Sequence, residues 1–301
     1  MMRNRLFFAA AFLVTVVATP AVAQRSECRL RIDTNPSSWI IRGYDPFGNS
    51  ASSGTFDLIF TNDGDAECVF SPVFVLDGEP FGLSAGNGRR TQYGIVDLFA
   101  GANATPLAGR TQRRATRRNV VVAPRSQEVV QFQLVVDERS ITRDGLHDQR
   151  VTIEAESSDG LPMAAEQLVL GLDVLPSATL GLSGAYRVNN GRAMVDLGEL
   201  QEGIAQVPLQ LRVQSTGRYK LTLESHNNGR LQLPGTQWFV PYGLAIDGQS
   251  IELAGGSGEY LSPTGQGLRR DSLPIRFRIG DVSDRRAGTY SDVISISVAP
   301  L

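Results

Sequence analysis

The chain has 301 residues, of which 29 are basic and 31 acidic, and its formal net charge is −2. So small a net charge gives no overall attraction to nucleic acid or to an anionic membrane surface. Its two cysteines, Cys28 and Cys68, are distant in the sequence from its two histidines, His147 and His226. A Cys/His metal site is therefore not indicated, and we expect neither a metal nor a cofactor.

The first 23 residues have the pattern of a secretory signal. Arg3 and Arg5 provide a positive start, residues 6–17 an apolar run, and residues 21–23 a small-residue cleavage site. The apolar run is short for a membrane span, and no later stretch is a candidate. We therefore expect a mature, soluble protein that begins at Gln24 and is exported through the inner membrane.

Residues 24–176 consist of short alternating or apolar segments separated by turn residues, which predicts an all-β, immunoglobulin-like sandwich domain. The predicted strands cover residues 28–32, 39–42, 55–61, 68–70, 93–99, 120–122, 130–136, 151–155 and 168–174. Residues 62–65 have turn chemistry, so we expect a hairpin between the segments on either side of them.

Cys28 and Cys68 form the candidate disulfide. In an oxidising, exported compartment an even cysteine count favours a bridge. The bridge would close a loop of about forty residues and contribute on the order of 4 kcal/mol by the chain-entropy model. Both cysteines lie in strand-like segments, where a bridge can tie strands together.

Residues 177–301 repeat this plan and predict a second, related sandwich domain. The segments 207–213 and 219–223 alternate and are expected to pair through residues 215–217. The other matched segments are 193–198 with 39–43, 241–244 with 92–95, 273–279 with 130–136, and 287–298 with 144–155.

The first half continues into a further strand at residues 168–174. The second half has no matching segment after its last strand. One face of this strand carries Tyr290, Ile294, Ile296 and Val298. We predict that these four residues line the edge of an open apolar groove, because a sandwich short of its last strand leaves N–H and C=O groups unpaired. The alternative is that residues 179–188, or another segment of the same chain, close this edge.

An open edge of this kind either aggregates or is filled by another chain. Four or five apolar side chains inserted into the groove would contribute about 1.5–3 kcal/mol each before ordering costs. We therefore expect a tight joint with a partner.

Three stretches of the second half carry a family resemblance. They are Gly217-Arg-Tyr-Lys-Leu-Thr-Leu-Glu-Ser225 with Asn228-Gly-Arg-Leu231, Pro241-Tyr-Gly-Leu-Ala-Ile-Asp-Gly248, and Ala287-Gly-Thr-Tyr-Ser-Asp-Val-Ile-Ser-Ile-Ser-Val298. In this order they resemble the spore coat protein U family, the pilin domain of archaic chaperone-usher pili. The resemblance implies a sandwich that lacks its last strand and receives an N-terminal segment of a neighbouring subunit, a form of β-augmentation.

The resemblance also implies the partners and the location. The partners would be a periplasmic pilus chaperone, an outer-membrane usher and an adjacent pilus subunit, and the chain would pass through the periplasm to the cell surface. Only residues 24–27 precede Cys28, and at about 3.3 Å per residue they cannot span a groove of a strand's length. We therefore expect an acceptor without a donor strand, as in a two-domain tip or tip-proximal subunit whose N-terminal domain is adhesive and binds a surface or glycan receptor. Unlike the first domain, residues 177–301 contain no cysteine.

Arginines are concentrated in one connection of the first domain. They are Arg110, Arg113, Arg114, Arg117 and Arg118, with Arg89 and Arg90 as possible neighbours. A solvated loop is the favoured interpretation. The functional interpretation is an anion-binding or receptor-binding face; nucleic acid is not expected, because interleaved aromatic residues are missing.

Two further patterns suggest chemistry weakly. Gly82-Leu-Ser84-Ala-Gly86 matches a nucleophile elbow, but the turn residues that follow favour a flexible loop over catalysis by Ser84. Asn62, Asp63, Asp65 and Glu67 could ligate calcium, but their spacing fits a turn better than an EF-hand loop.

We therefore expect a protein that is not an enzyme and that serves as an adhesive pilus subunit. One alternative is a periplasmic pilus-assembly chaperone with two immunoglobulin-like domains, which residues 120–129 partly suggest. The other is a secreted carbohydrate-binding or hydrolytic protein, which should have a ligand pocket in a complete monomer.

Overall fold

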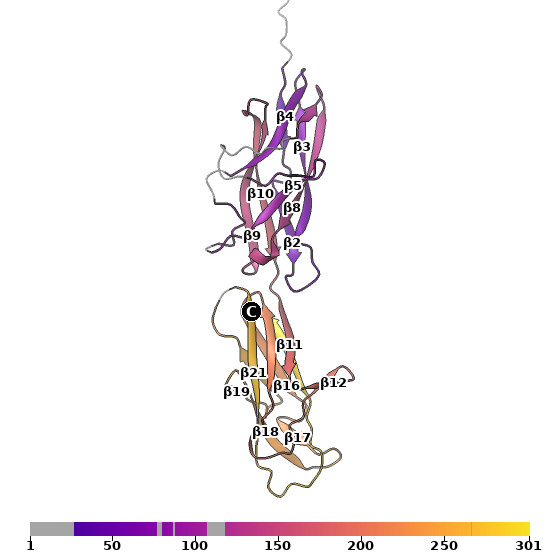
Figure 1. The fold of residues 1–301 in the computed structure, drawn as a ribbon, viewed down its shortest axis with the longest axis vertical. Helices are drawn as coiled ribbons and strands as arrows, with labels where there is room; N and C mark the ends of the chain where they lie inside the picture. Colours follow the sequence, from indigo (N-terminus) through magenta and orange to yellow (C-terminus); the bar gives the residue numbers. More distant parts are fainter. Residues whose placement is uncertain (1–26, 77–79, 87, 107–117, 266) are drawn as a thin grey trace, which may run out of the picture.

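The computed structural model describes residues 27–76, 80–86, 88–106, 118–265 and 267–301. These residues form strands and one short 3-10 turn, η1 (Glu138–Ser140), with no α-helix among them, which confirms the all-β prediction. No helix in this part of the chain is long and apolar enough to cross a membrane. The predicted secretory signal lies outside the described residues. Figure 1 shows two β-sandwiches placed end to end.

The first sandwich is built from two sheets of five strands. One sheet has the order β1 (Leu30–Asp33), β3 (Ser53–Asn62), β8 (Gln127–Val136), β5 (Tyr93–Asp97) and β6 (Ala102–Asn103). The other has the order β2 (Ser38–Tyr44), β10 (Pro162–Val174), β9 (Gly145–Glu156), β4 (Cys68–Val75) and β7 (Val120–Val122). All neighbours are antiparallel except β2 and β10, which are parallel.

Aromatic side chains fill the space between these two sheets. Phe56 of β3 and Phe132 of β8 stack with their ring centroids 5.6 Å apart, and Phe74 of β4 packs edge-on 5.0 Å from Phe132. All three side chains are at most 2% exposed. Because alternate residues of each strand face inward, the period-two pattern of the sequence produces this core directly.

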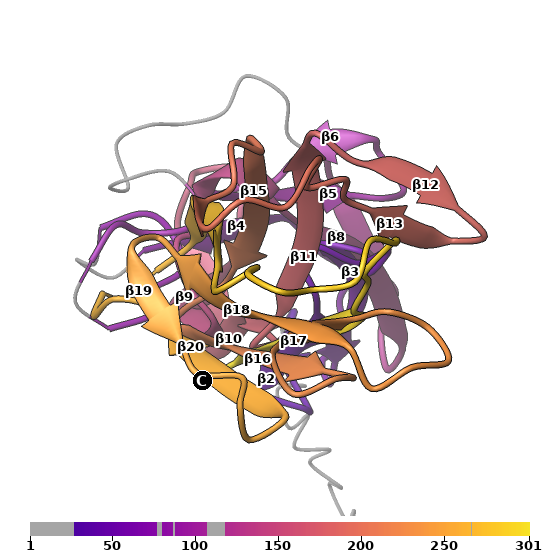
Figure 2. The same cartoon turned by 90° about the horizontal axis from the view of Figure 1, so that it is seen from below.

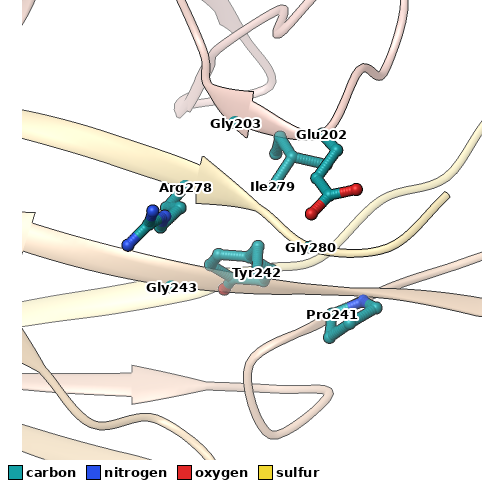
Figure 3. A pocket seen from close by; sticks show the side chains of 8 residues that line it. All are labelled: Glu202, Gly203, Pro241, Tyr242, Gly243, Arg278, Ile279 and Gly280. Carbon is teal, nitrogen blue, oxygen red and sulfur yellow. The ribbon is translucent and has the colours of Figure 1, made fainter.

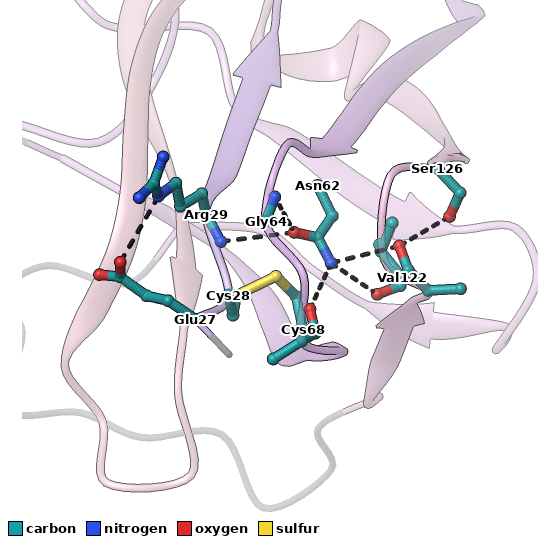
Figure 4. Close-up of a disulfide and its surroundings, with 10 residues drawn as sticks. Glu27, Cys28, Arg29, Asn62, Gly64, Cys68, Val122 and Ser126 are labelled. Carbon is teal, nitrogen blue, oxygen red and sulfur yellow. Dashed lines mark hydrogen bonds and ion pairs between the residues drawn. A yellow bond between two sulfur atoms is a disulfide. The ribbon is translucent and has the colours of Figure 1, made fainter. Parts of the chain in front are cut away.

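The disulfide predicted between Cys28 and Cys68 is present, with the two Cα atoms 5.3 Å apart (Figure 4). Cys28 precedes β1, whereas Cys68 begins β4 in the opposite sheet. The bridge therefore joins the two sheets of the first sandwich.

The hairpin predicted at residues 62–65 is wrong, because β3 and β4 lie in different sheets. The side chain of Asn62 makes the connection instead: its Oδ1 accepts hydrogen bonds from the N–H groups of Arg29 and Gly64, and its Nδ2 donates to the carbonyls of Ala66 and Val122 (Figure 4). The buried Asn62 amide thus satisfies backbone N–H and C=O groups at the point where the chain crosses from one sheet to the other.

The second sandwich has a seven-stranded and a three-stranded sheet. The larger sheet has the order β11 (Ala178–Gly184), β15 (Leu209–Ser215), β21 (Arg269–Ile279), β18 (Phe239–Ile246) and β17 (Arg230–Gln232), with β14 (Gly203–Ile204) paired to β21 and β19 (Gln249–Ile251) to β18. The smaller sheet has the order β20 (Ser257–Leu261), β16 (Tyr219–Ser225) and β22 (Ile294–Pro300). A separate hairpin pairs β12 (Arg187–Asn189) with β13 (Arg192–Met194).

Two predictions for this half are wrong. The hairpin expected through residues 215–217 does not form, because β15 and β16 lie in opposite sheets. Residues 193–198 do not form a core strand like that at 39–43; their beginning belongs to the exposed hairpin. Alternation places a side chain inward or outward but does not choose the neighbouring strand, so both errors concern pairing.

The two sandwiches have buried cores that share no residue. The junction between them is short, since β10 ends at Val174 and β11 begins at Ala178. The Leu175 N–H donates to the Tyr44 carbonyl on the first side, and the Ser177 N–H donates to Thr216 Oγ1 on the second. A division into separate folding domains at residues 176 and 177 stays a prediction.

Replacement of both bridging cysteines, C28S with C68S, should lower the free energy of unfolding of the first sandwich by about 4 kcal/mol, because the unfolded chain regains its loop entropy. Denaturant unfolding of residues 24–301 measures the change. As a control, the intact mass of the unmodified protein should gain two alkyl groups only after reduction; alkylation without reduction would contradict the bridge.

Candidate strand-acceptor groove

The strand β22 forms one edge of the smaller sheet. It pairs with β16 along its whole length, and no other described strand pairs with it. Its side chains alternate as the sequence predicts: Ile294, Ile296 and Val298 are half-buried against the second core, whereas Ser295 and Ser297 are exposed.

The free edge of β22 carries unused backbone groups. In the ladder with β16, the Leu301 N–H donates to the Arg218 carbonyl, and the His226 N–H donates to the Val293 carbonyl. Hydrogen-bonded pairs recur at every second residue of an antiparallel ladder, so the odd-numbered residues of β22 face β16. The N–H and C=O groups of Ile294, Ile296 and Val298 therefore point away from β16, and these are the residues whose side chains face the core.

The strand β11 forms a matching edge on the larger sheet. Among the described strands it pairs with β15 alone. The flanking bonds, Thr216 N–H to Ser177 carbonyl and Ala185 N–H to Pro208 carbonyl, turn its odd-numbered residues toward β15. Leu180 and Leu182 thus direct their backbone groups away from β15, where the Leu182 carbonyl accepts a hydrogen bond from Tyr186 Oη. Their side chains are half-buried against the second core.

The two edges together define what we call the groove: Leu180 and Leu182 of β11 with Ile294, Ile296 and Val298 of β22. Cα atoms of β11 and β22 come within 8 Å of one another, although the strands belong to different sheets. Residues 179–184 of the possible closing segment belong to β11, which pairs with β15 and forms no ladder with β22. That the groove is open stays a prediction. At about 3.3 Å per residue, the seven residues of β22 give an edge roughly 23 Å long.

The first sandwich shows how such an edge is covered. Its strand β9 pairs with β4 on one side, as β22 pairs with β16, and with β10 on the other. Leu168, Leu170 and Leu172 of β10 are at most 1% exposed. No described strand pairs with β22 as β10 pairs with β9.

The half-buried carboxylate of Asp292 fixes the start of β22. Asp292 Oδ2 accepts hydrogen bonds of 2.6 Å from Ser225 Oγ and from Tyr242 Oη, and its Oδ1 accepts from the N–H groups of Asn227 and Val293 at 2.9 and 2.8 Å. Burial, with the bond to Asp292, raises the pKa of Tyr242, which stays protonated and donates. Since Tyr242 belongs to the larger sheet, these bonds tie the groove edge across the sandwich.

Sequence reasoning did not identify several of these residues. The sequence pattern places Leu180 and Leu182 only in a possible closing segment and gives Asp292 no role. Tyr290 itself lies before β22 rather than on it; it is half-buried against the core and donates to the Arg286 carbonyl at 2.7 Å. The alternation of residues 178–184 is the one signal that could have identified the second wall.

The arginine connection is described only at Arg118, and Arg110, Arg113, Arg114 and Arg117 lie outside the described residues. The Arg118 guanidinium is 3.1 Å from Asp97 Oδ1 and lies over the Phe99 ring, 4.2 Å from its centroid. The Arg118 and Asp97 side chains are 15% and 6% exposed. Arg118 thus has a carboxylate partner, and an anion-binding role of the connection stays a prediction.

The four residues considered as calcium ligands do not converge on one point among the described residues. The Asn62 side chain is hydrogen-bonded to backbone groups. The carboxylates of Asp63 and Asp65 form ion pairs with Arg31 and Arg125, with N···O distances of 3.7 and 2.8 Å. No cluster of three or more potential metal ligands occurs within the described part of the chain.

The Gly82–Gly86 motif and the two histidines do not form a catalytic group among the described residues. Ser84 exchanges backbone hydrogen bonds with Asp148, and its hydroxyl donates to the Gly86 carbonyl. The His147 ring is fully buried: Nε2 donates to the Arg143 carbonyl, so Nδ1 of the neutral ring accepts from Thr91 Oγ1, both at 2.9 Å. Both ring nitrogens are therefore occupied by groups other than Ser84.

A shallow pocket of about 340 Å³ lies on the second sandwich, beside Glu202, Pro241, Tyr242 and Arg278 (Figure 3). It offers one acid and one base, and the Tyr242 hydroxyl already donates to Asp292. We assign it no chemistry.

No protein-family model matches the chain, and no curated protein matches it. The resemblance to the spore coat protein U family therefore stays a prediction. Among solved structures, the chain is similar to the CsuC–CsuE chaperone–tip adhesion subunit complex of archaic chaperone-usher Csu pili of Acinetobacter baumannii, at 13% identity and a TM-score of 0.45, over 87% of this chain and 97% of that chain.

Two further structures are similar at lower scores. The CupB6 tip adhesin of Pseudomonas aeruginosa has 11% identity and a TM-score of 0.37, over 91% of this chain and 95% of that chain. CfaE, the adhesive subunit of CFA/I fimbria of enterotoxigenic Escherichia coli, has 10% identity and a TM-score of 0.36, over 88% and 91%. At these scores the similarity carries no functional argument, which rests on the residues of this chain.

Protonation of His147 should destabilise the first sandwich. Burial lowers the pKa of His147, so the folded state holds this proton less tightly than the unfolded chain. Stability should therefore be fully present above the unfolded pKa of about 6.5 and decrease below it, by at most about 1.4 kcal/mol per pH unit. Denaturant unfolding between about pH 5 and pH 8, a range that spans the unfolded pKa, measures the slope.

The His147→Gln variant should lose this part of the slope, whereas His226→Gln, at an exposed turn position, should retain it. An unchanged slope in His147→Gln would show that His147 is not the titrating group.

The Asp292→Ala variant should lower the stability of the second sandwich by about 3 kcal/mol, because it leaves the buried hydroxyls of Ser225 and Tyr242 without their acceptor. Thermal unfolding followed by circular dichroism measures the loss. Glu259→Ala is the matched control: it removes an exposed carboxylate 2.9 Å from Lys220 Nζ and should change stability by less than about 1 kcal/mol. Equal effects of the two substitutions would argue against an anchor at Asp292.

Proposed function

We propose that this chain is an exported structural or adhesive subunit of an archaic chaperone-usher pilus, and that its groove accepts a donor strand from a neighbouring subunit or a chaperone. The observation that carries the proposal is the pair of facing edges, β11 and β22, each without a second partner among the described strands. The partners in this proposal are a periplasmic chaperone, an outer-membrane usher and an adjacent subunit. The chain acts by binding and not as an enzyme.

The groove has the two features that an inserted strand requires. The backbone groups of Ile294, Ile296 and Val298 offer a ladder to an extended segment, which is how β-augmentation provides affinity. The half-buried side chains on both walls offer an apolar surface to every second residue of that segment. A strand with alternating apolar residues satisfies both features at once.

The first sandwich supports a division of roles. Its sheets and the Cys28–Cys68 bridge form a closed core with β10 in place beside β9. A disulfide is consistent with export to an oxidising compartment. In this proposal the first sandwich carries the adhesive surface at or near the pilus tip and meets a surface or glycan receptor there.

A peptide test addresses the groove directly. A fluorescent peptide of about twelve residues, long enough at 3.3 Å per residue to cover the edge, should carry apolar side chains at alternate positions. It should bind residues 24–301, raise their thermal stability and reduce aggregation during expression in a periplasm that lacks the natural partners. A peptide of the same composition without alternation is the control ligand.

Substitution separates the groove from the rest of the sheet. Ile296→Ser removes about 2 kcal/mol of apolar contact and should weaken peptide binding about thirtyfold, whereas Ser297→Ala, on the exposed face of the same strand, should leave binding unchanged. Fluorescence anisotropy measures both. A stable monomer that binds no alternating peptide would sink the proposal and would favour a self-complete protein such as a pilus-assembly chaperone.

A further inference from the structure

The hairpin of β12 and β13 stands out from the second sandwich (Figures 1 and 2). All six of its strand residues are exposed, with Val188 70% and Met194 55% exposed. Its turn residues Asn190 and Gly191 have positive φ angles of 48° and 74°, which fits the Asn-Gly turn that closes two-residue hairpins. The hairpin is therefore shaped by its own turn, although a two-stranded ribbon this short gains little stability alone.

The hairpin carries positive charge and no negative charge. Arg187 lies opposite Met194 and Arg192 lies opposite Asn189, so both arginines share one face of the ribbon. Residues 185–194 contain no acidic residue. Neither guanidinium makes an ion pair with any residue that the structure describes.

The hairpin follows directly after β11, one of the two strands that define the groove. It begins three residues after Gly184, the last residue of β11, and Tyr186 between them donates from Oη to the Leu182 carbonyl on the groove wall. On its other side the chain returns to the sandwich at once, since Val195 and Leu197 are half-buried against the second core. A strand that enters the groove beside β11 therefore passes close to the hairpin.

We propose that the hairpin is a second docking surface for the protein that inserts its strand into the groove, and that it binds acidic residues flanking that strand. This inference rests on the proposed function. Two arginines that make no ion pair with a described residue, on a preformed ribbon, select a negative partner, and the exposed Met194 on the same face adds apolar contact beside the charges. The groove then provides most of the affinity, and the hairpin distinguishes a strand with an acidic flank from one without it.

Two peptides test this inference. Both carry the alternating apolar sequence described above; one has glutamates at both ends and the other has glutamines. At low salt the glutamate peptide should bind residues 24–301 about tenfold more tightly, and this preference should decrease strongly in about 1 M salt, where the Debye length is about 3 Å. The double variant R187Q/R192Q should bind both peptides with the affinity that the unmodified chain shows for the glutamine peptide.

The matched control is R212Q/R276Q, which removes two exposed arginines from the larger sheet away from the hairpin and should retain the preference. A preference that survives in R187Q/R192Q, or is lost equally in both variants, overturns the inference. Binding of both peptides with equal affinity to the unmodified chain also overturns it while leaving the proposed function intact. If neither peptide binds the unmodified chain, the proposed function fails as well.

Discussion

Backbone hydrogen bonding at the edges of the second sandwich is the constraint on which its proposed role depends. A strand can pair on two sides, and β22 uses only the side that faces β16. Its outward N–H and C=O groups belong to the residues whose side chains face the core. A single strand placed beside β22 would therefore both pair with these backbone groups and cover these apolar side chains. A short charged edge would instead discourage pairing; β22 has seven residues and no charge between Ile294 and Pro300.

The two sandwiches solve the same packing problem differently. In the first, β10 pairs with β9 and with β2, and its leucines are almost fully buried. The disulfide and the Asn62 amide then hold the two sheets together at the end where β1 and β4 begin. In the second, Asp292 makes a comparable connection between sheets, but no described strand covers β22. The edge of the first sandwich is paired at β9, whereas the corresponding edge at β22 has no second strand partner among the described residues.

The sequence predicted the features that depend on local pattern. The alternation at residues 294–298, the two sandwiches and the Cys28–Cys68 pair all follow from period-two burial and cysteine count. Strand pairing was harder, because it depends on contacts that are distant in the sequence. Residues 62–65 connect two sheets instead of closing a hairpin, and β11 pairs with β15. The wall formed by Leu180 and Leu182 could be recognised only once that pairing was known.

The walls of the groove are ordered before any partner arrives, which affects how tightly a strand can bind. β11 is held along its length by β15 and at its start by the bonds between Ser177 and Thr216. β22 is held by β16 and by Asp292. An incoming segment therefore has to order mainly its own backbone, about 1–2 kcal/mol per residue, and not the receiving strands. For the donor strand proposed above, preformed walls and a preformed hairpin should favour slow dissociation, as the proposed joint between two chains requires.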